Sequence, residues 1–359
     1  MQAVKPVKPV QAKKKAGLTA LACLIWVVVT GVVLWLITGL LVPKYMTDIQ
    51  EGALIAEYYE ETTDHDVVFI GDCEVYENFS PDVLWREYGV TSYIRGSAQQ
   101  LIWQSYYLLE ETLKHETPKV VLFNVLSMKY DVPQSEAYNR MTLDGMRLSP
   151  SKLGSIRASM TEEEDMLSYL FPLLRYHSRW NELSAEDVRW WFHRDLVSDS
   201  GYLMNVGIRP AENVPEGAPL ADYRFSQVCW FYLDRMAKLC EERGVQFVLI
   251  KAPSLYPYWY DQWEEQIEEY AVENGLPYLN FLELLEEVGL DFGTDTYDSG
   301  LHLNLYGAEK LSHWFGGWLM ENSPVEDRRG QAEYDAVWNE KSDVYAARQA
   351  RLEAARDQL

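Results

Sequence analysis

The chain has 359 residues, with 32 Lys and Arg against 55 Asp and Glu, and a formal charge of −23 at pH 7. Apolar residues make up 48% and aromatic residues 13%, which indicates a folded chain rather than a disordered one. So acidic a chain is not expected to bind nucleic acid, because phosphate binding requires a basic face. Four Cys are too few for a disulfide scaffold, no spacing of His, Cys and acids suggests a metal site, and we expect no cofactor.

The first 42 residues have the pattern of a membrane anchor. Residues 1–16 hold five Lys and no acid, and residues 17–42 then run for 26 positions without a charge. About 20 apolar residues are enough to cross a bilayer. Because the Lys cluster precedes this run, the positive-inside rule predicts a basic cytoplasmic tail at 1–16, a transmembrane helix at 17–42 and an extracellular remainder. A cleaved signal peptide is disfavoured, since its apolar part is only about 7–15 residues long.

The part after the apolar run is strongly acidic. It retains 27 basic residues, since five of the 32 lie in the tail, against all 55 acids, so its formal charge is near −28. Residues 43–65 are polar and acidic with some helical spacing, and we expect them to form a stalk. We predict that the protein is a single-pass protein of the cell membrane with its folded domain outside.

Strand and helix signals alternate from residue 66 onward. Short apolar runs predict five strands, at 67–70, 91–94, 119–123, 245–250 and 276–280. Helical patterns are found at 81–88, 97–115, 225–243, 257–274 and 305–321. Residues 97–100 (Ser-Ala-Gln-Gln) read as a capping box that begins the second of these helices. This alternation predicts an α/β fold in which a parallel sheet of about five strands is covered by helices on both faces.

Two further segments complete the predicted organisation. Residues 130–225 contain no clear buried strand and many aromatic residues, so we expect a mainly helical insertion within a domain at 66–322. Residues 323–359 are charged and rich in Ala, and we expect a charged helical tail. Ligands of parallel sheets bind beyond the carboxyl ends of the strands, so the residues that follow the predicted strands are the candidates for a site.

Three groups at these positions could form a nucleophilic site. Cys73 follows the first strand, and His302 and Asp298 lie in the loop before the last helix of the domain. A nucleophile needs a base, and the base needs an orienting acid, so we assign these roles to Cys73, His302 and Asp298 in that order. Asp295 is a second candidate for the acid.

An oxyanion formed at this site would need hydrogen-bond donors. The candidates are the backbone N–H groups of Cys73 and Gly96 and the side chain of Asn124. Candidate substrate contacts at the same edge of the sheet are Asp72, Ser97, Lys251, Tyr256 and Trp259. The two aromatic residues could stack on sugar rings, although burial in the core is at least as good an interpretation.

Together these motifs resemble the SGNH (GDSL-type) hydrolase superfamily. In that family a strand ends in Gly-Asp-Ser, a Gly follows the second strand, an Asn follows the third, and Asp-x-x-His lies near the C-terminus. The resemblance covers roughly residues 66–322, and its most specific part is His-Leu-Asn-x-x-Gly-Ala-x-Lys at 302–310. Here Cys73 replaces the Ser, and Asp298 and His302 are one residue further apart than in the family pattern.

The resemblance implies a three-layer, flavodoxin-like SGNH fold and an acyl-transfer or ester-hydrolysing activity. A membrane-anchored outer domain of this kind is similar to bacterial envelope O-acylation proteins, such as alginate acetyltransferases and the teichoic-acid D-alanyl transfer protein. By that resemblance the partners would be an envelope polysaccharide or teichoic-acid-like acceptor and a membrane-bound O-acyltransferase. The alternative is a catalytically inactive descendant that binds glycan or serves as a scaffold for a partner.

Overall fold

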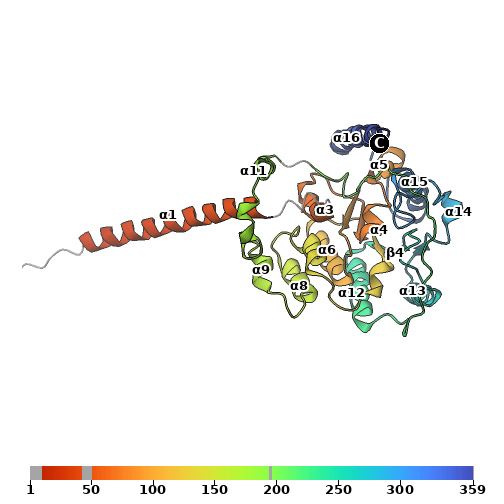
Figure 1. Ribbon diagram of the computed structural model, residues 1–359, viewed down its shortest axis with the longest axis horizontal. Helices are drawn as coiled ribbons and strands as arrows, with labels where there is room; N and C mark the ends of the chain where they lie inside the picture. The colour runs from red at the N-terminus through yellow and green to blue at the C-terminus, as the bar shows by residue number, and fades with distance from the viewer. Residues whose placement is uncertain (1–9, 43–50, 194–195, 359) are drawn as a thin grey trace, which may run out of the picture. The chain divides into compact units, whose positions relative to one another are not determined.

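The computed structural model describes residues 10–42, 51–193 and 196–358, and it divides into two units. One unit contains the N-terminal helix together with residues 170–195, and the other contains the rest of the described chain. In the first unit, helix α1 (Val10–Leu41) runs without interruption, and its stretch Gly17–Leu41 is long and apolar enough to cross a membrane (Figure 1). Most of the predicted basic tail, residues 1–9, lies outside the described residues.

The second unit is built on a parallel sheet of five strands. The strands are β1 (Val67–Gly71), β2 (Ser92–Gly96), β3 (Val120–Asn124), β4 (Gln246–Lys251) and β5 (Tyr278–Asn280). Their order across the sheet is β2-β1-β3-β4-β5, and every neighbouring pair is parallel. Helices connect the successive strands, all of which are parallel, and this confirms the predicted α/β fold.

Helices cover both faces of this sheet. Alternate residues of β1 point to opposite faces, so that Val67 and Phe69 belong to one core cluster while Val68 and Ile70 belong to the other. The first core is completed by α5 (Pro81–Tyr88), α15 (Leu305–Asn322) and α16 (Ala332–Arg356), and the second by α6 (Ile102–His115), α12 (Gln227–Arg243) and α13 (Asp261–Asn274). The result is the three-layer arrangement predicted from the sequence.

The remaining helices are short. They are α3 (Glu51–Glu57), η1 (Tyr58–Glu60), α4 (Cys73–Tyr76), η2 (Val125–Lys129), α7 (Glu136–Leu143), α8 (Pro150–Ser159), α9 (Met166–Leu170), α10 (Leu173–Tyr176), η3 (His177–Asn181), α11 (Ala185–Phe192) and α14 (Leu285–Val288). The segment predicted as a helical insertion at 130–225 is helical in its first two thirds only. No helix or strand lies between residues 203 and 226, where the chain follows the domain in extended form.

Three sequence expectations about local structure differ from the structure. The capping box expected at 97–100 does not form, because Gln99 adopts a left-handed backbone with φ 51° and α6 begins only at Ile102. The Gln104 side chain caps that helix instead, accepting from the Leu101 N–H at 3.0 Å. Ser97 is buried and its hydroxyl bonds to Gln100 at 3.2 Å, so it is a turn residue and not a helix cap.

The expected stalk at 43–65 is also not separate from the domain. Residues 43–50 lie outside the described residues, but Leu54 and Ile55 are fully buried, and the Leu54 carbonyl accepts a hydrogen bond from Tyr93 at 3.2 Å. The tail at 323–359 is helical as expected, from Ala332 to Arg356, and it packs against the domain. Trp338 and Tyr345 of α16 are buried, because that helix lays one face on the domain.

Candidate active site

The candidate nucleophile lies at the sharp turn from β1 into α4. Asp72 begins this turn, and its Oδ1 accepts from the Glu74 N–H at 3.2 Å, which places Cys73 at the first position of the helix. A Cβ on Gly71 would lie 2.5 Å from a methyl carbon of Val75, so only Gly fits where the strand ends. Local packing thereby brings the Cys73 side chain to the carboxyl edge of the sheet.

The loop before α15 holds a histidine and a carboxylate against each other. Asp298 Oδ2 lies 2.7 Å from Nδ1 of His302, and its Oδ1 accepts from the His302 backbone N–H at 2.8 Å. The extra residue in this spacing is absorbed by Ser299 and Gly300, which both take positive φ angles. The Thr296 hydroxyl fixes the loop by accepting from the Gly300 N–H at 2.8 Å and donating to the His302 carbonyl at 2.8 Å.

Cys73 lies near the same imidazole, close enough for each group to shift the pKa of the other. The Nε2 of His302 is buried and has no hydrogen-bond partner among the described residues. The structure therefore brings Cys73 close to the pair formed by His302 and Asp298, which follow it by more than 220 residues in the chain.

The charges around this group set its protonation. Burial raises the pKa of the Cys73 thiol to about 11, with a further contribution from the Asp72 carboxylate, while the neighbouring His302 opposes both. Burial works against a charge on His302, but the hydrogen bond to Asp298, the nearby Cys73 and the Glu77 carboxylate raise its pKa well above the usual range. Burial would raise the pKa of Asp298, yet its two bonds from His302 lower it.

Sequence reasoning missed two residues that contact His302. Glu77 lies with one carboxylate oxygen 3.7 Å from Nδ1, and Tyr297 lays its ring nearly parallel to the imidazole with centroids 6.1 Å apart. The Tyr297 hydroxyl donates to Glu77 and so holds that carboxylate in place. Glu77 follows Cys73 by four positions, so helical spacing could have placed both on one side of the turn, whereas nothing in the sequence distinguishes Tyr297 from the other Tyr residues.

Asp295, the other candidate acid, does not serve His302. It is buried, and its Oδ2 accepts from Lys310 Nζ at 2.7 Å and from the Asp291 N–H at 2.8 Å. These bonds fix the start of α15 and leave Asp298 as the carboxylate on His302. Lys310 is the last residue of the motif that begins at His302, so this part of the motif has a structural explanation.

The three candidate oxyanion donors differ in whether they are free to bind an oxyanion. The Cys73 N–H belongs to the first turn of a helix, where no acceptor exists within the helix. Gly96 packs against Gly71, since an added Cβ would lie 3.1 Å from the Gly71 carbonyl oxygen and 3.4 Å from that of Asp72. Asn124, by contrast, commits its amide to Asp72 at 3.1 Å and Glu74 at 3.0 Å, so its interpretation as an oxyanion donor does not fit.

A buried network of charges lies beneath the site. Lys251 and Glu74 are both fully buried, with Nζ 2.9 Å from Glu74 Oε2 and 2.7 Å from the Ala252 carbonyl. Burial and the neighbouring Glu74 raise the pKa of Asp72 to about 6. Lys251 cannot reach a substrate, so its interpretation as a substrate contact is corrected here: it supports the strand ends from below. Asp72 is likewise part of this network.

The other predicted substrate contacts also separate into buried and exposed residues. Ser97 is fully buried and bonded to Gln100, and Trp259 is buried with its indole N–H 2.6 Å from Glu264. Neither presents a surface to a ligand, because each side chain completes the core. Tyr256 is about half exposed, at 47%, and remains available for contact.

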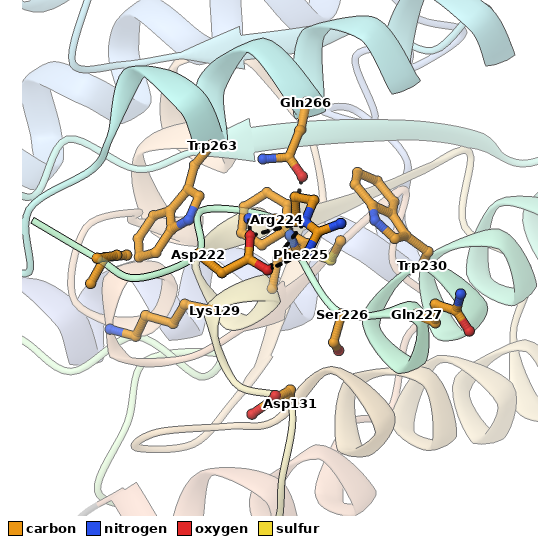
Figure 2. A pocket seen from close by; sticks show the side chains of 12 residues that line it. Lys129, Asp131, Asp222, Arg224, Phe225, Ser226, Gln227, Trp230, Trp263 and Gln266 are labelled. Atoms are coloured by element: carbon orange, nitrogen blue, oxygen red, sulfur yellow. Dashed lines mark hydrogen bonds and ion pairs between the residues drawn. The ribbon is translucent and has the colours of Figure 1, made fainter.

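A hollow of about 660 Å³ in the same unit was not foreseen from the sequence. Figure 2 shows Trp263 and Trp230 on either side of an ion pair formed by Asp222 and Arg224, whose closest atoms are 2.6 Å apart. Lys129 also lines the hollow; burial lowers the pKa of its amine, and the carboxylates of Asp72 and Glu74 oppose that shift. No cluster of three metal-ligating side chains is present in the described part of the chain.

No protein-family model matches the sequence, and no curated protein sequence does. Solved structures do show similarity. A lipolytic protein of the G-D-S-L family from Desulfitobacterium hafniense is 14% identical at a TM-score of 0.35, covering 71% of this chain and 99% of its own. An acylhydrolase from Bacteroides fragilis is 11% identical with a TM-score of 0.37, and the match covers 74% of this chain and 94% of that protein. A GDSL-like lipase from Bacteroides thetaiotaomicron is 14% identical with a TM-score of 0.34, and the match covers 77% of this chain and 96% of that protein. Likeness at this level says nothing about what the chain does.

Proposed function

We propose that this protein is a membrane-anchored, extracytoplasmic acyl transferase or esterase that acts on a cell-envelope glycan. The observation that supports this proposal best is the pairing of His302 Nδ1 with the Asp298 carboxylate at 2.7 Å, with the Cys73 thiol close enough to the imidazole for each to shift the pKa of the other. A nucleophile, a base and an orienting acid in that order are the parts that acyl transfer requires. The motif resemblance to the SGNH superfamily points to the same chemistry.

The proposed reaction has two halves. The thiol proton moves to Nε2 of His302, the sulfur attacks the carbonyl carbon of an acyl ester, and the ester C–O bond breaks as the leaving oxygen takes that proton. The resulting thioester on Cys73 is then attacked by water or by a glycan hydroxyl, whose proton goes to His302, and the thiol is regenerated. Asp298 keeps the imidazole oriented and stabilises its charged form in both halves.

Membrane anchoring is part of the proposal. The span Gly17–Leu41 follows the Lys cluster, and its length of 25 residues exceeds the apolar part of a signal peptide. Retention of this helix is further supported by its contacts with α10, η3 and α11, which a cleaved leader would lose. The acyl donor is then proposed to be a membrane-bound O-acyltransferase in the same membrane, and the acceptor a polysaccharide or teichoic-acid-like polymer.

A second candidate function is favoured by the protonation of the site. The raised pKa of Cys73 leaves little thiolate at neutral pH, and a raised pKa on His302 leaves little neutral imidazole to take a proton. Such a site would suit a domain that binds glycan or a partner protein without catalysis. The hollow beside Lys129, with its two Trp side chains, would then be the place to look for a bound sugar.

Turnover of an activated ester distinguishes the two functions. The full-length protein in lipid nanodiscs would be compared with Cys73→Ser and Cys73→Ala, using an aryl acetate as the substrate. The proposal expects activity in the wild type, altered activity with Ser and none with Ala. If wild type and Cys73→Ser are both inactive while both retain an envelope glycan, the binding function is correct.

A further inference from the structure

Residues 170–193, which we call the juxtamembrane segment, pack on the C-terminal end of α1. The ring of Trp191 lies 4.9 Å from that of Trp35, and a Cβ on Gly39 would clash with the Trp191 indole. The Arg179 guanidinium donates to the Leu41 carbonyl at 2.9 Å, which satisfies one of the backbone oxygens left free where a helix ends. This segment and the end of the apolar helix therefore form one structural unit.

The position of these contacts along α1 determines how deep they lie in the bilayer. The apolar stretch of 25 residues is about 37 Å long at 1.5 Å per residue, whereas the hydrocarbon core of a bilayer is about 30 Å thick. The last residues of the stretch therefore reach the headgroup region. Trp35 and Leu41 are separated by about 9 Å along the axis. Trp191, which contacts Trp35, and Arg179, which contacts Leu41, therefore lie near the boundary between acyl chains and headgroups.

The surface chemistry of the segment suits that boundary. Large apolar side chains project from it without cover, including Phe192 at 77% exposed and Trp180 at 72%. The other exposed apolar residues of the segment are Phe171, Leu174, Leu183 and Val188. Three Arg balance three acids between 170 and 193, so the segment is neutral within an otherwise strongly acidic outer chain. Trp, Phe and Arg on short helices are typical of chain that lies in a membrane interface.

We propose that the juxtamembrane segment lies in the lipid–water interface of the outer leaflet, with Phe192, Trp180 and their neighbours inserted among the lipids. This inference rests on the proposed membrane anchoring of α1. It gives the chain a second contact with the bilayer, about 140 residues after the anchor in sequence, and explains why a segment with so much exposed apolar surface is inserted into an acidic, soluble-type domain. The occupant of this surface is lipid and not another protein.

Environment-sensitive labels test the proposal in the full-length chain. The fluorophore NBD would be attached at Phe192→Cys or Trp180→Cys, with Val272→Cys as the matched control because Val272 is 82% exposed in the other unit. The background would carry Cys73→Ser and Cys23→Ala, since Cys229 and Cys240 are buried. A separate protein labelled at the native Cys23 reports on α1 itself. Each protein would be reconstituted in phosphatidylcholine vesicles that contain lipids with a nitroxide near the headgroup or deep in the acyl chain.

We expect labels at positions 192 and 180 to emit at shorter wavelength than the label at 272 and to be quenched several-fold more by the shallow nitroxide. The Cys23 label should also be quenched by the lipid nitroxides, because Cys23 lies within the apolar span. If the Cys23 label is quenched but the labels at 192 and 180 behave like the label at 272, α1 is a membrane anchor but the inference about the juxtamembrane segment is wrong. A blue-shifted label that no lipid nitroxide quenches would mean that protein covers the surface, which also overturns the inference. An unquenched Cys23 would refute the anchor itself.

Discussion

Asp298 holds His302 by both its ring and its backbone, with Nδ1 2.7 Å from one carboxylate oxygen and the main-chain N–H 2.8 Å from the other. This double contact fixes the imidazole in one orientation. It also fixes the tautomer, because a carboxylate accepts only from a protonated Nδ1. The loop geometry is therefore suited to a base that acts on the neighbouring thiol.

Replacing Asp298 tests whether its contact with His302 acts on the reaction rate or only stabilises the loop. Asp298→Asn should lower the rate of Cys73 acylation by an aryl ester by about 10²–10⁴, because the amide no longer stabilises a charged imidazole. Asp295→Asn is the matched control: it should destabilise the fold by weakening the contact with Lys310 but leave the acylation rate of the folded protein within about twofold. Equal rate losses in both variants would show that the loop, and not the Asp298 carboxylate, matters.

The pH dependence of alkylation tests the environment of the thiol. Because the pKa of Cys73 is raised to about 11, the rate of its reaction with iodoacetamide should still be rising at about pH 9, where an ordinary Cys with a pKa near 8.5 is largely ionised. Glu77→Gln removes a nearby negative charge that raises this pKa, so its profile should shift to lower pH. Cys73 should be quantified by peptide mass spectrometry. A plateau below pH 8 in the wild type would contradict the buried, acid-lined environment.

The buried pair Lys251–Glu74 should respond very differently to single and double substitution. Glu74→Gln leaves the charge of Lys251 buried without its carboxylate, and we expect a loss of about 3–5 kcal/mol in the free energy of unfolding. Adding Lys251→Met removes that charge and should restore most of the loss. Urea unfolding followed by fluorescence measures the double variant and the two single variants, Glu74→Gln and Lys251→Met. A double variant as unstable as the sum of the two single variants would mean that the pair does not interact.

Asp72 should destabilise the fold above its own pKa. Its pKa is raised to about 6 in the folded state against about 3.9 when unfolded, so its favourable contribution is present below about pH 4 and is lost as the pH rises through 6. Asp72→Asn removes this dependence while keeping an acceptor for the Glu74 N–H. The variant should therefore be more stable than wild type by about 2–3 kcal/mol at pH 7 and equal to it near pH 4. A constant difference across that range would exclude titration of Asp72 as the cause.

The sheet was predictable because its strands are buried on both faces and read as uninterrupted apolar runs. Val67 to Ile70 and Val120 to Phe123 leave no alternative to a covered parallel sheet. The residues that end these strands, and the motif that begins at His302, led us to expect that Cys73, His302 and Asp298 lie at one edge of the sheet, and the structure pairs His302 with Asp298 there. Parallel strands bring their carboxyl ends to one edge, so distant residues converge there by topology alone.

The sequence predictions that were wrong concern residues whose surroundings depend on long-range packing. Lys251 and Asn124 looked like ligand contacts because polar side chains at strand ends usually face solvent. Here Glu74, which comes from another segment, draws both into a buried network. Leu54 and Trp338 likewise belong to the core, although their surroundings in sequence are charged. No periodicity in a single segment can show which distant residue will cover it.

Covalent trapping tests the central claim most directly. The full-length protein in nanodiscs would be incubated with an aryl acetate at pH 8, quenched in acid and mapped by peptide mass spectrometry. We predict one acetyl group on the peptide that contains Cys73, its absence in Cys73→Ala and a strong reduction in His302→Gln. An unlabelled Cys73 in wild-type protein whose native fold is verified by circular dichroism, or equal acetylation in His302→Gln, would contradict it.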